Sequence, residues 1–169
     1  MIILGIDPGT TSVGYAVLEG RERGCRLLSA DLIRIHTSSP CERLKELSAG
    51  VNSLINEWSP GALATERLFF AKNQKTALRV AEARGAILLT AALAELMVYE
   101  YTPLEIKRAV TGDGTADKLQ LQKMMRLSFP EIAGLRARDD VFDAAGIALT
   151  CWLQDIRSGA TTRSIQEIS

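Results

Sequence analysis

Four acidic side chains, two that end predicted strands and two in the first turn of a predicted helix, could share one site. Asp7 ends the first β-branched run, and Glu66 ends a later short strand. Asp140 and Asp143 are three positions apart in a predicted helix, so their side chains project from the same helix face. If the two strands are neighbours, all four carboxylates meet at one edge of the sheet. Four unneutralised acids in one place repel one another, so this site requires cations.

Oxygen ligands without histidine or thiolate favour hard divalent ions. Mg²⁺ is the expected ion, with Mn²⁺ as its substitute. Two such ions about 4 Å apart can hold both the attacking and the leaving oxygen of an in-line phosphoryl displacement. The acids therefore indicate phosphodiester hydrolysis with two ions in each active site.

Each acid also has a structural interpretation. Asp7 precedes Pro8 and suits a turn in which the side chain accepts backbone N–H groups. Asp139 and Asp140 stand where a helix N-cap is expected, and Asp143 in the first turn favours the helix dipole. The conjunction of two strand-ending acids with a D-x-x-D pair favours the catalytic interpretation, since the chain offers no other candidate catalytic set.

The composition indicates one globular domain. The chain has 169 residues, of which 47% are hydrophobic, and its 20 Lys and Arg balance 20 Asp and Glu. A chain of this length buries roughly 70% of its surface on folding, so it needs no structural metal. Three separated cysteines without C-x-x-C spacing, and His36 as the single histidine, argue against a zinc site and a disulfide framework.

Hydrophobic patterning excludes a membrane protein, because no apolar run reaches the roughly 18 residues that a membrane span needs. The N-terminal segment has no basic region before its apolar run, which predicts a cytoplasmic protein. Residue periods predict an α/β domain over 1–158 and a polar, flexible tail over 159–169. The expected order is strands 2–6, 14–18 and 25–35, helix 44–58, strand 61–66, helix 76–96, strand 97–102, and helices 103–110, 118–127 and one from Asp139 or Asp140.

A basic segment in the middle of the chain favours a nucleic-acid partner despite the net charge of zero. Residues 67–126 contain 10 basic and 6 acidic side chains. Phe69 and Phe70 stand close to Lys72 in this segment, and an exposed aromatic among lysines suits base stacking. The alternatives are solvated helix faces and a pair of core phenylalanines. Helix 76–96 is apolar on nearly every side, which predicts either a dimer interface or a buried central helix.

Four sequence blocks resemble the RuvC Holliday-junction resolvases of bacteria. They are GIDPGTTSVGYAV (5–17), ERLFFAKNQKTALRVAEARG (66–85), GDGTADK (112–118) and DVFDAAGIAL (140–149). The first block alone is weak, because sugar kinases and related ATPases share it. The second and third blocks are specific, and the four occur in family order across nearly the whole chain.

The resemblance implies a homodimeric, Mg²⁺-dependent DNA endonuclease with a ribonuclease H-like fold and a mixed five-stranded sheet flanked by helices. Such an enzyme nicks two opposed strands of a four-way junction in recombination and repair, beside the branch-migration complex RuvA–RuvB. The positions that match the family's metal-binding acids are Asp7, Glu66, Asp140 and Asp143, and those that match its DNA-contacting residues are Phe69, Lys107 and Lys118. We assign Lys118 a catalytic role and place Phe70 and Lys72 in the DNA interface.

The chain departs from the family pattern in the last helix. Val141 and Phe142 fill the gap between the aspartates, where small residues are common, and Gly146 replaces a larger apolar residue. These departures leave the pose of this helix open. Two other functions are weighed: an ATPase-like phosphotransferase of related fold, which ATP binding would reveal, and a non-catalytic junction-binding module, which Mg²⁺-dependent nicking would exclude.

Overall fold

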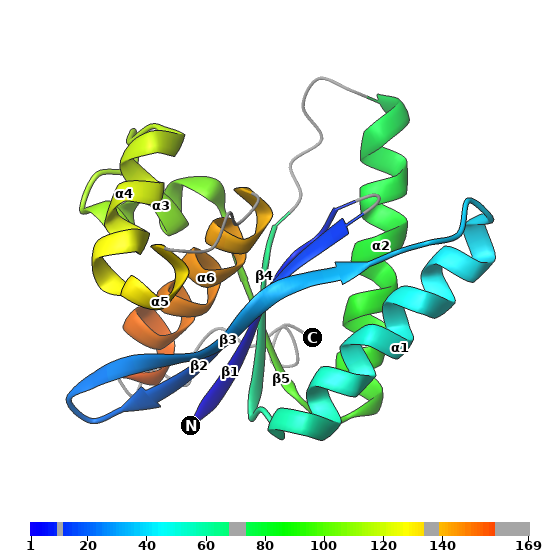
Figure 1. Cartoon of the computed structure of the whole chain (residues 1–169), viewed down its shortest axis with the longest axis horizontal. Coiled ribbons are helices and arrows are strands. Elements are labelled where there is room, and N and C mark those ends of the chain that lie inside the picture. The colour runs from blue at the N-terminus through cyan, green and yellow to red at the C-terminus, as the bar shows by residue number, and fades with distance from the viewer. Residues whose placement is uncertain (10–11, 68–73, 134–138, 158–169) are drawn as a thin grey trace, which may run out of the picture.

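A five-stranded sheet forms the centre of the molecule. The computed structural model describes residues 1–9, 12–67, 74–133 and 139–157. The strand order is β3-β2-β1-β4-β5 (Figure 1). The strands are β1 (Ile2–Asp7), β2 (Ser12–Arg21), β3 (Gly24–Arg34), β4 (Ala62–Glu66) and β5 (Met97–Tyr101). The predicted sheet of five strands is therefore confirmed.

The sheet is mixed, as the sequence predicted. β1, β2 and β3 follow one another along the chain and pair antiparallel. β4 pairs parallel with β1, and β5 pairs parallel with β4. Parallel neighbours require a crossover connection, which a helix supplies between β3 and β4 and again between β4 and β5. This topology brings the ends of β1 and β4 to the same edge.

Helices cover both faces of the sheet (Figure 1). α1 and α2 pack together on one face, and α6 lies across the other, where it also contacts α3 and α4. The helices are α1 (Pro40–Trp58), α2 (Gln74–Leu93), α3 (Pro103–Thr111), α4 (Lys118–Ser128), α5 (Pro130–Ala133) and α6 (Asp139–Cys151), and α6 continues into the π-helical turn η1 (Trp152–Ile156).

Alternation along β1 decides which side chains reach α6. Leu4 and Ile6 belong to the core on the α1 and α2 face. Ile3 belongs to the core on the α6 face, and Gly5 lies directly against the backbone of α6. Successive side chains of a strand point to opposite faces, so Asp7 follows Ile3 and Gly5 onto the α6 face.

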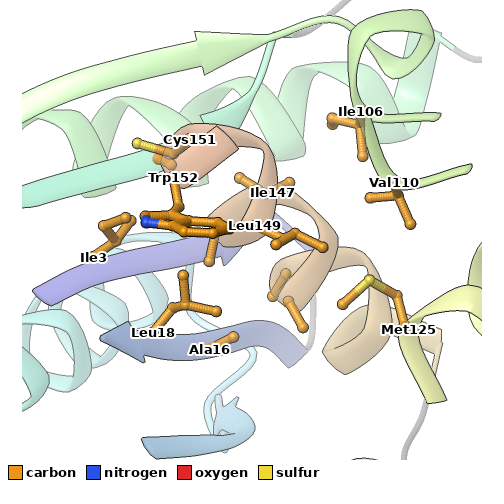
Figure 2. Packing of buried hydrophobic residues seen from close by; sticks show 14 of the residues in the cluster. Ile3, Ala16, Leu18, Ile106, Val110, Met125, Ile147, Leu149, Cys151 and Trp152 are labelled. Carbon is orange, nitrogen blue, oxygen red and sulfur yellow. The ribbon is translucent and has the colours of Figure 1, made fainter. Parts of the chain in front are cut away.

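The core on this face fixes the position of α6. Figure 2 shows the Trp152 ring lying between the strands and α6, close to Ile3 and Leu18, with Ile147 and Leu149 on the helix beside it. Ile147 is completely buried and Leu149 nearly so. Burial of such side chains stabilises a fold by about 1.5 to 3 kcal/mol each. The helix that carries two of the candidate acids is therefore anchored along its length.

Capping boxes fix where α3 and α4 begin. The Thr102 hydroxyl accepts from the Glu105 N–H, and the Glu105 carboxylate accepts from the Thr102 N–H. Asp117 and Gln120 exchange the equivalent bonds at α4. A cap of this kind contributes about 1 kcal/mol. Lys118 is consequently the first residue of α4.

The helix expected to be apolar on every side is exposed on one face in the single chain. Ala83 and Ile87 of α2 are buried in the core. The opposite face exposes 65% of Leu78, 61% of Leu89 and 78% of Leu93. A buried central helix is therefore excluded for this chain taken alone.

Two further expectations concern membrane-spanning helices and the bounds of the domain. No helix of the described residues combines the length and apolar character that a bilayer span requires. Residues 158–169 lie outside the described part of the chain. The extent of the domain over 1–158 and the tail over 159–169 accordingly stay predictions.

Candidate active site

Asp7 and Glu66 are the last residues of two neighbouring parallel strands. Ile6 of β1 pairs with Thr65 of β4, one position before each acid. Ala64, two positions before Glu66, belongs to the core on the α6 face. Both carboxylates therefore lie at one edge of the sheet and on the face covered by α6.

The backbone of α6 lies directly against β1 and β2 at two glycines. A Cβ atom at Gly14 would overlap the carbonyl oxygen of Asp140, and one at Gly5 would overlap the carbonyl oxygen of Ala144. Gly14 pairs with Asp7 across the two strands. The first turn of α6 is consequently held beside the strand end that carries Asp7.

A hydrogen bond ties Asp140 to the start of β2. The Ser12 hydroxyl donates to Asp140 Oδ2 over 3.2 Å, across 128 positions of sequence. Ser12 has no role predicted from the sequence. Its only signal was its place in the block GIDPGTTSVGYAV, which gives no indication of its partner.

The pKa of Asp7 reports the electrostatics of the whole site. Burial, followed by repulsion from Asp143, Glu66 and Asp140, raises the pKa of Asp7 to about 7, against a smaller opposing effect of Lys118. Burial and Asp143 also raise the pKa of Glu66. Burial raises the pKa of Asp143 in spite of the neighbouring Lys118. The carboxylates of β1, β4 and α6 therefore repel one another.

Lys118 lies between two carboxylates of α6. Its Nζ is 3.4 Å from Asp143 Oδ2 and 3.2 Å from Asp139 Oδ2. Burial lowers the pKa of Lys118, but attraction to Asp143 and hydrogen bonding to Asp139 outweigh it and the pKa rises above its usual value. The ammonium is therefore charged throughout the neutral range.

A pocket of about 280 Å³ joins the lysines to the acids. Two carboxylates and two ammonium groups surround an apolar floor, and the lining residues are Glu66, Asp143, Lys107, Lys118, Pro103, Ile106 and Leu121. Both lysines assigned from the sequence therefore reach a pocket that two of the four acids also line. A phosphate in this pocket would meet the positive charge of the lysines beside carboxylates able to hold cations.

The donor set fits a hard divalent ion. Four carboxylates without histidine or thiolate offer only oxygen ligands, and their mutual repulsion in this site is the charge that a cation would neutralise. As the described side chains stand, no three of them are close enough to form a ready metal cluster. The residues therefore fit the ion in chemistry and in shared location, while their oxygens have still to converge on it.

Three of the predicted DNA-contacting residues cannot be placed. Phe69, Phe70 and Lys72 lie outside the described residues. Their assignment to the DNA interface stays a prediction. Arg67, two positions before Phe69, is exposed next to the end of β4.

The departures in α6 are accommodated by its packing. Phe142 is 1% exposed and carries the Arg126 guanidinium of α4 at 4.5 Å from its ring centroid. Gly146 faces Ile106 and Leu121, with ordinary contact distances available for a Cβ. The larger residue between the aspartates therefore joins α6 to α4, and the last helix keeps Asp140 and Asp143 at the sheet edge.

The family comparison agrees with this architecture. A family model described as Crossover junction endodeoxyribonuclease RuvC matches residues 3–151. The crossover junction endodeoxyribonuclease RuvC of Moorella thermoacetica is 48% identical over 153 residues, covering 88% of this chain and 89% of that relative. This likeness extends from β1 through α6 and includes every element that carries a candidate acid.

Solved structures show the same fold. Thermus thermophilus RuvC in complex with a Holliday junction substrate matches with a TM-score of 0.83 and 32% identity over 95% of this chain and 97% of that one. A yeast mitochondrial Holliday junction resolvase matches with a TM-score of 0.66 at 16% identity, which shows the fold alone. The ribonuclease H-like fold is confirmed, and neither a phosphotransferase nor a non-catalytic module is favoured. The chain belongs to the RuvC family of crossover junction endodeoxyribonucleases.

Proposed function

We propose that this chain resolves four-way DNA junctions by hydrolysing a phosphodiester in each of two opposed strands at the Asp7 site. Its family is one of DNA endonucleases. A relative of the same fold has been solved with a Holliday junction substrate, which supports branched DNA as the substrate here. The observation that carries the proposal is that Asp7 and Glu66 end neighbouring parallel strands at one sheet edge, beside the first turn of α6 with Asp140 and Asp143. The raised pKa of Asp7 agrees with this arrangement.

The four carboxylates hold the divalent metal on which nucleases of this family depend. We assign two Mg²⁺ ions, for which Mn²⁺ can substitute, to Asp7, Glu66, Asp140 and Asp143. When bound, the ions supply Lewis-acid activation of the phosphodiester and of its attacking water. The protein contributes an oxygen-only donor set and an α6 that is fixed to the sheet. The Ser12 hydroxyl orients the Asp140 carboxylate by donating to its Oδ2.

Lys118 balances negative charge on the phosphate that is cleaved. Lys118 lies in the capped first turn of α4, and its ammonium reaches the pocket beside Asp143. Lys107 lines the same pocket and holds the neighbouring phosphate. Lys118→Met should reduce turnover far more than junction binding, measured by single-turnover cleavage and by gel shift. Equal losses in both would contradict the catalytic role.

DNA binding extends from this pocket to the segment after β4. Phe69 and Phe70 stack on junction bases, and Lys72 contacts phosphate. Stacking of a base on an aromatic side chain contributes about 1 to 3 kcal/mol. The position of the segment supports the assignment, because it follows directly on Glu66 in the chain.

The exposed face of α2 pairs with a second copy of the chain. Leu78, Leu89 and Leu93 are exposed on this helix, and Gly85 and Ala92 between them are small enough for close approach of two helices. A two-fold dimer presents two identical active sites, which is how symmetric paired incisions arise.

The cellular setting follows from the family resemblance. We place the enzyme in the cytoplasm, acting on junctions that the branch-migration complex RuvA–RuvB moves during recombination and repair. A labelled junction incubated with and without RuvA–RuvB tests this partner, because a functional link would change the rate or the position of cleavage.

One experiment tests the proposed function. The purified protein is incubated with a labelled four-way junction or with linear duplex of the same sequence, with and without Mg²⁺. Paired nicks in the junction alone, only with Mg²⁺, are expected. Asp7→Asn should abolish them while junction binding in Ca²⁺ persists. Cleavage without added metal in the presence of chelator, or equal cleavage of duplex, would contradict the proposal.

A further inference from the structure

Asp139 bridges α4 and α6 outside the set of acids assigned to metal. Its Oδ2 lies 3.2 Å from Lys118 Nζ, and its Oδ1 accepts a hydrogen bond of 2.7 Å from Gln122 Nε2. Lys118 and Gln122 are one turn apart on α4, so both reach the same carboxylate from one helix face. Asp139 is the first residue of α6.

Lys118 has two carboxylate partners, of which only Asp143 is also assigned to metal. Asp139 and Asp143 are one turn apart on α6, and the ammonium lies between them. Asp143 is assigned to metal, and an ion bound there competes with the ammonium for the same negative charge. Asp139 is outside the D-x-x-D spacing and its side chain is 59% exposed, so it remains available to Lys118.

We propose that Asp139 is a positioning residue that keeps Lys118 directed into the pocket when metal engages Asp143. This inference rests on the proposed catalytic role of Lys118. In this proposal Asp139 is assigned to neither metal nor phosphate, and it acts through the Lys118 ammonium. Gln122 restricts the orientation of the Asp139 carboxylate by donating to its other oxygen, Oδ1. A single exposed ion pair has no such second contact to hold the carboxylate in place.

Asp139→Asn tests the inference through cleavage and binding measured separately. An exposed pair orients a flexible side chain only in part, so we expect a loss of about threefold to tenfold in the single-turnover rate. The junction Kd in Ca²⁺ and the thermal midpoint should stay close to those of the parent chain. Asp139→Glu should recover part of the rate. Glu131→Gln removes another exposed carboxylate, on α5, and serves as the charge control.

A double-mutant cycle decides whether Asp139 acts through Lys118. In the Lys118→Met background, Asp139→Asn should cause no further loss of cleavage, because there is no ammonium left to position. Gln122→Ala leaves both carboxylates of α6 in place and should reproduce the loss of rate to a smaller extent.

Three outcomes would overturn the inference. Asp139→Asn with the parent rate, beside a slow Lys118→Met, would leave the role of Lys118 intact and remove that of Asp139. An equal further loss in the Lys118→Met background would show that Asp139 acts through its own charge. A normal rate for Lys118→Met would remove the catalytic role of Lys118 and this inference with it.

Discussion

At the scale of single residues, the most informative group is Asp7. Its carboxyl is buried at a strand end and shares the α6 face with three other acids, and this raises its pKa to about 7. A carboxyl in water ionises near pH 4. In the absence of metal, the folded chain therefore binds a proton that the unfolded chain releases.

This difference makes the stability of the metal-free protein depend on pH. Below about pH 4 both states are protonated, and between about pH 4 and 7 only the folded state keeps the proton. The free energy of unfolding should fall as the pH rises through this window and then level off. Glu66 and Asp143 shift in the same direction and add to the effect. Thermal unfolding in chelator, recorded across this range, measures it.

Asp7→Asn is the matched variant for that measurement. It removes the titrating group, so it should flatten the pH dependence and raise the metal-free midpoint near pH 8, by about 2 to 4 °C for each kcal/mol of repulsion relieved. A variant as pH-dependent as the parent chain would show that Asp7 is not the responsible group.

Metal affinity should also depend on pH. Below about pH 7 a bound ion has to displace the proton from Asp7, so Mg²⁺ affinity should increase with pH and level off above that value. Titration calorimetry in two buffers of different ionisation enthalpy measures the protons released. Binding of equal strength across the range, with no proton release, would contradict the raised pKa.

The four acids could be predicted from the sequence, whereas their side-chain contacts could not. Asp7 and Glu66 were recognisable because each ends a predicted strand, and Asp140 and Asp143 because of their D-x-x-D spacing at the start of a predicted helix. The contacts of Ser12 with Asp140 and of Asp139 with Lys118 were not, since each joins segments that only the folded chain brings together. Local spacing carries no information on such pairs.

At the scale of elements, Gly146 offers a stabilising substitution. A Cβ there would lie 3.6 Å from Ile106, 3.7 Å from Val110 and 3.9 Å from Leu121, which are ordinary contacts. Gly146→Ala should therefore stabilise the fold by about 1 kcal/mol through helix propensity. Denaturant unfolding measures this change. Destabilisation would show that the added methyl group does not fit between α6 and α3. Gly14→Ala is the opposite control, because its Cβ would overlap the Asp140 carbonyl oxygen.

Sequence patterning predicted the five strands and five of the helices, and it missed α5 and η1. The strands were predicted from short β-branched runs, and the helices near residues 44–58 and 118–127 from apolar residues that recur with the helical period. α5 has four residues, too few for a period. The π-helical turn η1 buries Asp155, which accepts a hydrogen bond of 2.5 Å from the Tyr101 hydroxyl. An isolated aspartate in sequence does not reveal that its partner is on β5.

At the scale of the whole molecule, the exposed face of α2 predicts assembly. Leu89→Glu places a charge among the exposed leucines of that face and should convert a dimer into an 18.4 kDa monomer in sedimentation experiments. Burying an unpaired charge in an apolar interface is costly. Leu127→Glu, an equally exposed leucine on α4, should leave the dimer intact. A parent chain that sediments as a monomer at micromolar concentration would contradict the assignment.

The sequence predicted the sheet and its covering helices but left the face of α2 undecided. Apolar residues on every side of a helix indicate burial without saying whether the same chain or another copy provides it. In the described part of the chain, Leu78, Leu89 and Leu93 remain largely exposed, so this face is not buried in the single chain. The partner is a property of the assembly, and no local pattern encodes it.

The glycine contacts of α6 have a consequence for how this enzyme can adapt to its substrate. At Gly5 and Gly14 the backbone of α6 lies directly against the strands, with no room for a side chain between them. We expect α6 and these strands to move together, so the spacing of the acids should be insensitive to movement of the arms of a branched duplex. Redesign toward other branched substrates should therefore vary α3 and α4 and leave these two glycines untouched.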